Sequence, residues 1–208
     1  MNIELFVQSV VSSPGALSQE GIAFREKQVA EAEAVVREAK QNAGCAEAKV
    51  VSIGKRHGAL NARLIEVTAA LKDKSGVRAV AADLKAVKAE VARRTPLAAE
   101  QGLLTEALQM LVGEDLVQAE LAAKEARLEI KRAQRTWCVC KAAEETAKLW
   151  SAMAPAMKRD PNLAVQMDNG GIIVQYAKKI AEIDAEIDEL RNALARETQA
   201  AAGAHIQY

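Results

Sequence analysis

The side chains that could do metal or redox chemistry in this sequence are few. The three cysteines are Cys45, Cys138 and Cys140. On a helix the one-residue gap between Cys138 and Cys140 points their sulfur atoms about 200° apart, so the two cannot ligate one ion together. An odd, sparse set of cysteines also fits a reducing compartment better than a disulfide framework. We therefore expect structural cysteines and no metal or other cofactor, with Cys140 on a packed face and Cys138 and Cys45 off it.

His57 is the other candidate for chemistry. A single histidine without further ligands nearby does not make a zinc site. It occupies the one polar position in a long apolar stripe, where a polar residue can fix the register of paired helices. We expect His57 to be a register-setting core residue, with a pH-sensitive packing role as the alternative.

No constellation typical of catalysis is apparent in the sequence. Gly170-Gly171 follows no predicted strand and precedes no lysine, so it predicts a hinge and no phosphate loop. No nucleophile is placed beside a base, and no pair of carboxylates falls in a plausible cleft. We predict that the protein is not an enzyme.

Two sets of residues are candidates for binding a partner. The first is a row of basic side chains interrupted by Glu120, Glu125 and Glu129 and without interleaved aromatic residues, unlike a surface that binds single-stranded nucleic acid. Acidic residues between 182 and 189 could pair with this row, within the chain or between subunits. The second is the N-terminal segment, which is more apolar than a free tail needs and could fold back on the chain or dock on another protein. The candidate partner-binding residues are Lys124, Arg127, Lys131 and Arg135 in the row, and Ile3, Phe6 and Val10 in the segment.

The strongest structural signal is a set of thirteen positions spaced alternately three and four residues apart, of which twelve are apolar. This spacing is typical of a coiled-coil seam, meaning the stripe of side chains that one helix turns toward its partner helix. It predicts a long helix over 15–73, ended by Lys74-Ser75-Gly76. The positions are Val29, Ala32, Val36, Ala39, Ala43, Ala46, Val50, Ile53, His57, Leu60, Leu64, Val67 and Leu71.

Further helices are predicted along the rest of the chain. Short apolar stripes predict tip helices over 77–93 and 96–112, because Thr95 could cap a helix and Pro96 could occupy its first position. Gly113 favours a turn, followed by a return helix over 114–157. A linker over 158–171, a C-terminal helix over 172–200 and a tail over 201–208 complete the chain. The return seam contains Leu116, Ala119, Ala123, Ala126, Ile130, Ala133, Trp137, Cys140, Ala147 and Ala154, and the C-terminal seam contains Ile173, Tyr176, Ile180, Ile183, Ile187, Leu190 and Leu194.

The predicted fold class is all-α. We expect an elongated antiparallel coiled-coil hairpin over 15–157, with a small helical-bundle tip, a C-terminal helix packed along the stalk, and an N-terminal apolar segment over 1–14. Alanine makes up about a fifth of the chain and aromatic residues only 3%, which fits helices packed closely together.

Composition also bears on location and partners. No apolar run is long enough for a membrane span, and the N-terminus lacks the basic region of a signal peptide, so we expect a cytoplasmic protein, or a virion protein if the source is a phage. The bias toward alanine, valine, glutamate and arginine suggests a bacterial or phage source. Basic and acidic residues number 28 each, so net charge does not attract nucleic acid or an anionic membrane.

Sustained seams without catalytic groups predict a non-catalytic protein–protein interaction protein that serves as a structural, assembly or adaptor component. The alternative is a nucleic-acid-associated helical protein that uses the basic row. The sequence leaves a monomer and a homo-oligomer equally open.

Overall fold

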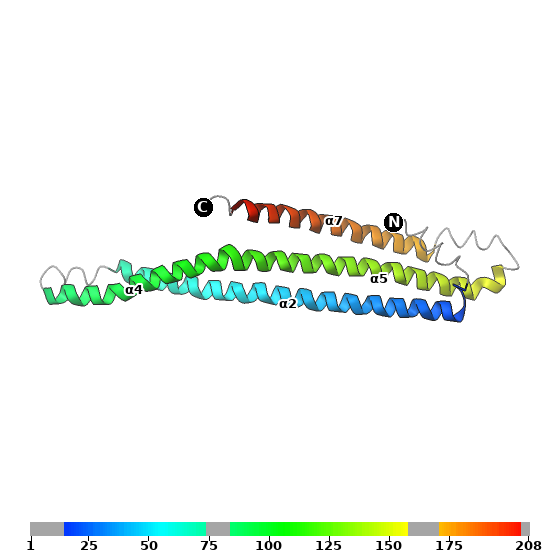
Figure 1. The fold of residues 1–208 in the computed structure, drawn as a ribbon, viewed down its shortest axis with the longest axis horizontal. Coiled ribbons are helices and arrows are strands. Elements are labelled where there is room, and N and C mark those ends of the chain that lie inside the picture. The colour runs from blue at the N-terminus through cyan, green and yellow to red at the C-terminus, as the bar shows by residue number, and fades with distance from the viewer. Residues whose placement is uncertain (1–14, 74–83, 158–170, 205–208) are drawn as a thin grey trace. The chain divides into compact units, whose positions relative to one another are not determined.

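The described part of the protein is entirely helical (Figure 1). The computed structural model describes residues 15–73, 84–157 and 171–204. Its elements are α2 (Gln19–Lys72), α4 (Leu84–Met110), the π-helix η1 (Leu111–Leu116), α5 (Val117–Met157) and α7 (Ile172–Ala204). The all-α prediction is therefore confirmed, and no described helix is long and apolar enough to cross a membrane. Ile3, Phe6, Val10 and most of the predicted linker lie outside the described residues.

The chain divides into two compact units, which we describe separately. The first, called the three-helix unit, comprises residues 1–44 and 124–208. The second, called the two-helix unit, comprises residues 45–123.

In the three-helix unit both neighbours of α5 run antiparallel to it. Lys148 of α5 pairs with Glu26 of α2 at 2.7 Å, and Trp137, earlier in α5, donates to Glu33, later in α2, at 3.3 Å. The hydroxyl of Tyr176 in α7 donates to Glu145 at 3.1 Å, whereas Asp184 contacts the earlier Arg135. Figure 1 shows α5 between α2 and α7 in this unit.

A cap explains why α2 begins at Gln19 and not at residue 15. The Ser18 hydroxyl accepts a hydrogen bond from the Gly21 amide at 3.0 Å, which satisfies one of the free amides at the helix start. Gly15 has a φ of 78°, a left-handed conformation that favours glycine. Ser151 of α5 then donates to the Leu17 carbonyl at 3.1 Å, which fixes this turn against the three-helix unit.

The predicted seams are the buried faces of the helices. All thirteen positions of the α2 stripe are buried or half-buried, including Ile53 and Val67, each 1% exposed. The ten predicted positions in η1 and α5 and the seven in α7 are also buried or half-buried. In the predicted tip, the apolar stripe of 77–93 would place Val91 on a packed face, but Val91 is 57% exposed, so this position of the stripe is wrong. The three-four spacing thus predicted the packed faces of the long helices correctly.

The predicted break between two tip helices is wrong, because α4 continues through Pro96. Proline cannot donate to the carbonyl of residue i−4, which here belongs to Ala92. Ala92 and Pro96 are both exposed, so water can hydrate that carbonyl. The half-buried Leu97, Leu104 and Leu108 continue one seam through the site, and their packing offsets the local cost of proline. The described part of the tip is therefore one helix and no small bundle.

The predicted turn at Gly113 is also wrong, because η1 joins α4 to α5 without a break. Seam positions Leu111 and Leu116 are five residues apart, one more than the three-four alternation allows. A π-helical turn holds one extra residue, so it returns the seam to the same face after this insertion. The return helix accordingly begins as α5 at Val117, and α7 extends to Ala204, past the predicted start of the tail.

In the two-helix unit, polar contacts join α4 to the last turns of α2. Arg63 makes a two-point contact with Glu100, at 2.7 and 3.1 Å, and Gln101 donates to Thr68 at 3.1 Å. Arg94 donates to the Asp73 carbonyl at 2.9 Å, next to the C-terminus of α2. A cation at this position complements the negative end of the helix dipole. These contacts show that α2 and α4 lie side by side and run antiparallel.

Glu90 holds the arginines that cap α2, and this contact makes stability depend on pH. Hydrogen bonds from Arg93 and then from Arg94 lower the pKa of Glu90 from 4.5 to about 2. A carboxylate with a lowered folded-state pKa contributes stability that is complete above pH 4.5 and is lost as the pH falls toward 2. We expect wild-type protein to be more stable than Glu90→Gln at neutral pH, and the difference to disappear over this acid range. Urea denaturation followed by circular dichroism at several pH values measures it. A constant difference down to pH 2 would contradict the assignment.

Three glycines of α2, Gly44, Gly54 and Gly58, have no packing role within the described chain, and the last two lie in the two-helix unit. A β-carbon added at Gly54 or Gly58 would meet no atom within 4 Å. Glycine inside a helix costs about 1 kcal/mol relative to alanine. Contacts inside the two-helix unit therefore do not explain why α2 has glycine at these positions.

Candidate interaction surfaces

The helix α5 carries a second seam, which the sequence analysis missed. It is offset by two residues from the first seam, about 200° around the helix, and so lies on the opposite face. Within the three-helix unit Leu128, Cys138 and Ala142 of this stripe are buried. The sequence contains the spacing of this stripe, although four of its seven positions are charged. Its members are Lys124, Leu128, Lys131, Arg135, Cys138, Ala142 and Glu145.

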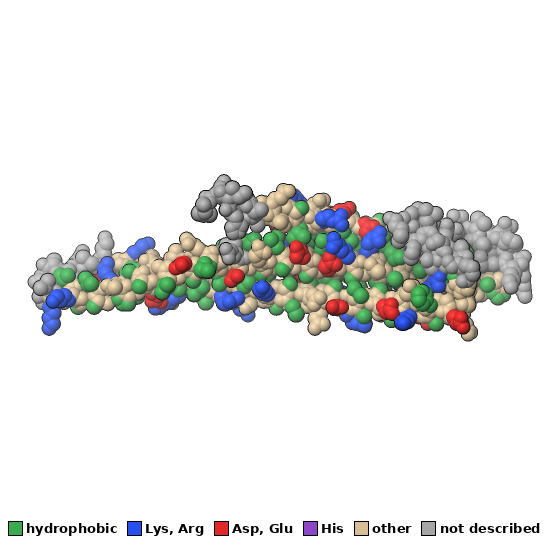
Figure 2. Space-filling view, viewed as in Figure 1, with side chains coloured by type: hydrophobic (Ala, Val, Ile, Leu, Met, Phe, Trp, Pro, Cys, Tyr) green, Lys and Arg blue, Asp and Glu red, His purple; other side chains and the backbone are tan. Residues whose placement is uncertain are grey.

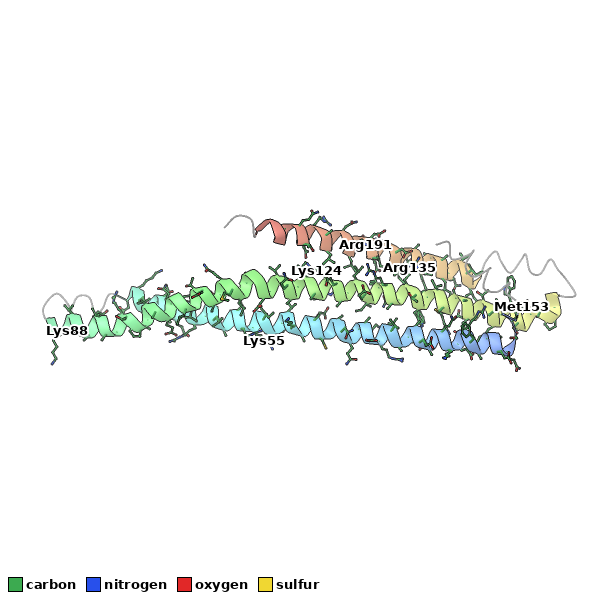
Figure 3. All side chains as sticks on the ribbon, in the orientation of Figure 1. Lys55, Lys88, Lys124, Arg135, Met153 and Arg191 are labelled. Carbon is green, nitrogen blue, oxygen red and sulfur yellow. The ribbon has the colours of Figure 1, made fainter. Side chains whose placement is uncertain are left out.

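The basic members of this second seam form ion pairs with α7. Lys124 pairs with Glu197, and Lys131 pairs with Glu186. Arg135 contacts both carboxylate oxygens of Asp184, at 2.5 and 3.2 Å. Figure 3 shows Lys124 and Arg135 on the side of α5 that faces α7. Lys124, Lys131 and Arg135, all proposed as partner-binding, are thus paired within the chain. Arg127, also proposed, is exposed on α5.

The ion pairs are expected to orient α7 more than to stabilise it. The side chain of Arg135 is 28% exposed and that of Asp184 is 44% exposed, so water weakens their attraction. A double-mutant cycle with Arg135→Ala and Asp184→Ala should give a coupling energy of about 0.5–1 kcal/mol. The coupling should fall at high salt. A coupling of zero at low salt would show that the pair does not form in solution.

An aromatic cluster joins α5 to α7. Tyr176, Ile180, Cys138 and Ala142 form its buried part, and Trp137 and Trp150 pack against it. Burial, followed by the hydrogen bond to Glu145, raises the pKa of Tyr176. The aromatic residues thus pack where these two helices meet, and the geometry is that of a core contact.

The cysteines are placed differently from the prediction in one respect. Cys140 is half-buried on the first seam, as expected, and Cys45 is exposed. Cys138 was expected off the packed faces but is only 4% exposed, because it lies on the second seam. Burial raises the pKa of Cys138 and Cys140, which keeps both as neutral thiols. Among the described residues no group of three or more histidine, cysteine or acidic side chains could hold a metal ion.

A buried carboxylate, Glu144, sits within the first seam of α5. It is 4% exposed and accepts hydrogen bonds from Lys141 at 2.7 Å and Lys148 at 2.5 Å. Burial acts to raise the pKa of Glu144, but the two lysines outweigh it and the pKa is lowered. Lys148 also reaches Glu26 of α2, so the buried charge links helices within the three-helix unit. An ionised, doubly paired carboxylate of this kind positions helices and is poorly suited to donate a proton.

His57 is half-buried in the α2 seam of the two-helix unit. This position is compatible with a register-setting role, which stays a prediction.

An open groove of about 540 Å³ lies among α2, α5 and α7 in the three-helix unit. Its apolar lining includes Val36, Trp137 and Ile183, and its charged lining carries both signs. Trp137 donates its indole N–H to Glu33 across the groove at 3.3 Å. Cys138 also lines the groove, but burial raises the pKa of its thiol and keeps it neutral, so we describe the groove as a mixed surface between helices.

The outer face of α4 is an apolar stripe without a described partner helix. Its positions alternate by four and three residues, like a seam, but all are exposed. Leu103 is 68% exposed and Met110 is 67% exposed. Figure 2 shows hydrophobic side chains at the surface in this part of the chain. The stripe comprises Ala92, Pro96, Ala99, Leu103 and Met110, with Glu106 interrupting it.

Comparison with known proteins identifies no relative. The chain matches no family model, no curated protein and no solved structure.

Proposed function

We propose that this protein is a non-catalytic helical interaction protein, a structural, assembly or adaptor component that binds another protein through the outer face of α4. The proposal includes the coiled-coil hairpin predicted from the seams, in which α2 pairs with the helix that returns along it.

One observation carries the proposal: α4 has a second stripe with seam spacing whose large side chains are exposed. Seam spacing turns one side of a helix toward another helix. Leu97, Leu104 and Leu108 on the inner side of α4 are already half-buried, so the outer stripe is surplus to the packing of the two-helix unit. Scattered apolar residues on a surface need no explanation, but an aligned row over five helical turns favours a partner helix.

The internal pairing of the basic row argues against the nucleic-acid alternative. Lys124, Lys131 and Arg135 each contact a carboxylate of α7, and releasing them to bind phosphates would break those pairs. Equal numbers of basic and acidic residues leave no net field to attract a polyanion.

Affinity capture from the source organism tests the proposal. Tagged wild-type protein is compared with Leu103→Glu/Met110→Glu, which places charge in the outer stripe. Val174→Glu, at a half-exposed apolar position on α7, is the control. We expect nuclease-resistant binding of a protein by the wild type and the control, and its loss in the double variant. Capture of the same proteins by all three, or of none by the wild type, would refute the proposal.

A further inference from the structure

The outer face of α2 in the two-helix unit is a second exposed apolar surface, separate from that of α4. Val51 is 56% exposed and Ile65 is 63% exposed. Between them lie Gly54, Gly58 and Ala62, all exposed, and Ala69 follows one turn later. These positions are three or four residues apart, so they share one side of the helix. That side lies well around the helix from Ile53, Leu60 and Val67, which belong to the seam.

We infer that this face binds a second copy of itself, giving an antiparallel dimer with its two-fold axis between Gly58 and Ala62. With that axis, every large side chain of the face meets a small residue. Ile65 lies opposite Gly54 of the second copy, and Val51 lies opposite Ala69. Gly58 faces Ala62 at the centre, where two backbones can approach closely. Such self-complementarity is what an isologous interface requires, and it gives both glycines the packing role that they lack within one chain.

The charges at the borders of the face select the second copy and its direction. Lys55 and Glu66 lie on one border, and Glu47 and Lys72 continue the stripe at its two ends. In an antiparallel pair related by a two-fold axis, this border of one helix lies against the same border of the second copy, which runs in the opposite direction. Lys55 then lies opposite Glu66 of the second copy, and Glu47 lies opposite Lys72. In a parallel pair the two different borders of the face would meet instead, so Lys55 would not lie opposite Glu66 of the second copy. Figure 3 shows Lys55 on the outer side of α2.

The alternative occupant is a different protein with an apolar helix, but the observations favour a second copy. A foreign helix would have to supply large side chains opposite Gly54, small ones opposite Ile65, and charges in the reverse order of those on α2. This chain already supplies all three in the required order.

Sedimentation equilibrium over a range of concentrations tests the dimer in the full chain. We expect wild-type protein to shift from monomer to dimer mass as its concentration rises. Lys55→Glu places two like-charged contacts in the dimer and should raise its Kd at least about tenfold. Lys55→Glu/Glu66→Lys restores opposite charges in both contacts and should return the Kd to about the wild-type value. Circular dichroism checks that each variant keeps its helix content.

Two further variants separate this surface from that of α4. Ile65→Glu should remove the dimer, whereas Leu103→Glu, an equivalent change on α4, should leave the Kd unchanged. Lys88→Glu alters the net charge as Lys55→Glu does but lies on α4, and it should also have no effect. A monomer at every concentration, or a Kd that Lys55→Glu leaves unchanged or the double charge reversal fails to restore, would overturn the inference. Because Leu103→Glu affects capture of a foreign protein and not the dimer, failure here is distinguishable from failure of the proposed function.

Discussion

Replacing Ile53 with alanine is expected to lower the free energy of unfolding by about 2–5 kcal/mol. Ile53 is 1% exposed and is one of the two largest fully buried side chains among the described residues. It lies on the α2 seam of the two-helix unit, so the substitution removes side-chain volume from a packed face. Urea denaturation followed by circular dichroism measures the change.

Leu103→Ala is a closely matched control for this prediction. Leucine and isoleucine are isomers, so both substitutions delete the same number of carbon atoms, but Leu103 is 68% exposed. A substitution at such an exposed site should change the free energy of unfolding by about 0.5 kcal/mol or less. Equal losses in the two variants would mean that the three-four stripe does not mark the packed face of α2.

Replacing Tyr176 with alanine should have a comparable effect on the contact between α7 and α5. Tyr176 is 8% exposed and packs with Cys138, Ala142 and Ile180. Removing a buried aromatic side chain costs about 3–5 kcal/mol, and here the loss should appear as faster amide hydrogen exchange throughout α7. Mass spectrometry of peptic peptides measures the exchange.

Tyr176→Phe separates packing from hydrogen bonding at the same site. It keeps the ring and removes only the hydroxyl that donates to Glu145, so it should cost about 1 kcal/mol. Unchanged protection of α7 in Tyr176→Ala would show that α7 does not depend on this cluster.

Much of the fold could be predicted because alanine, valine and isoleucine at three-four spacing leave few ways to bury one face of a helix. Thirteen positions in α2 and seven in α7 were identified from spacing alone, and all are buried or half-buried. Such regular spacing over many turns outweighs the local preferences of single residues.

The helix ends were less predictable, because tertiary packing overrides local propensity. Pro96 and Gly113 both favour a break, yet the helix continues through each. At Pro96 the unpaired carbonyl faces water. At Gly113 the seam itself contains an extra residue between Leu111 and Leu116, and a π-helical turn restores its phase. That five-residue step was visible in the sequence. It is better evidence for a continuous helix than Gly113 is for a break.

The role of the basic row required the structure. From the sequence alone its residues could form a binding surface or pair with acidic residues far along the chain. The contacts of Arg135 with Asp184, and of Lys131 with Glu186, depend on where α7 lies, which spacing within one helix does not specify. Cys138 was misplaced for the same reason, since the second seam of α5 exists only because α7 covers it.

The central claim is that the seams pair α5 antiparallel with both α2 and α7. Carbodiimide treatment of dilute wild-type protein tests it without any substitution, because the reagent joins a lysine directly to a carboxylate that touches it. In the monomer band we expect crosslinked peptides joining Lys148 to Glu26, Lys131 to Glu186 and Lys124 to Glu197. Crosslinks in the opposite chain order, such as Lys124 to Glu182 without Lys124 to Glu197, would contradict it.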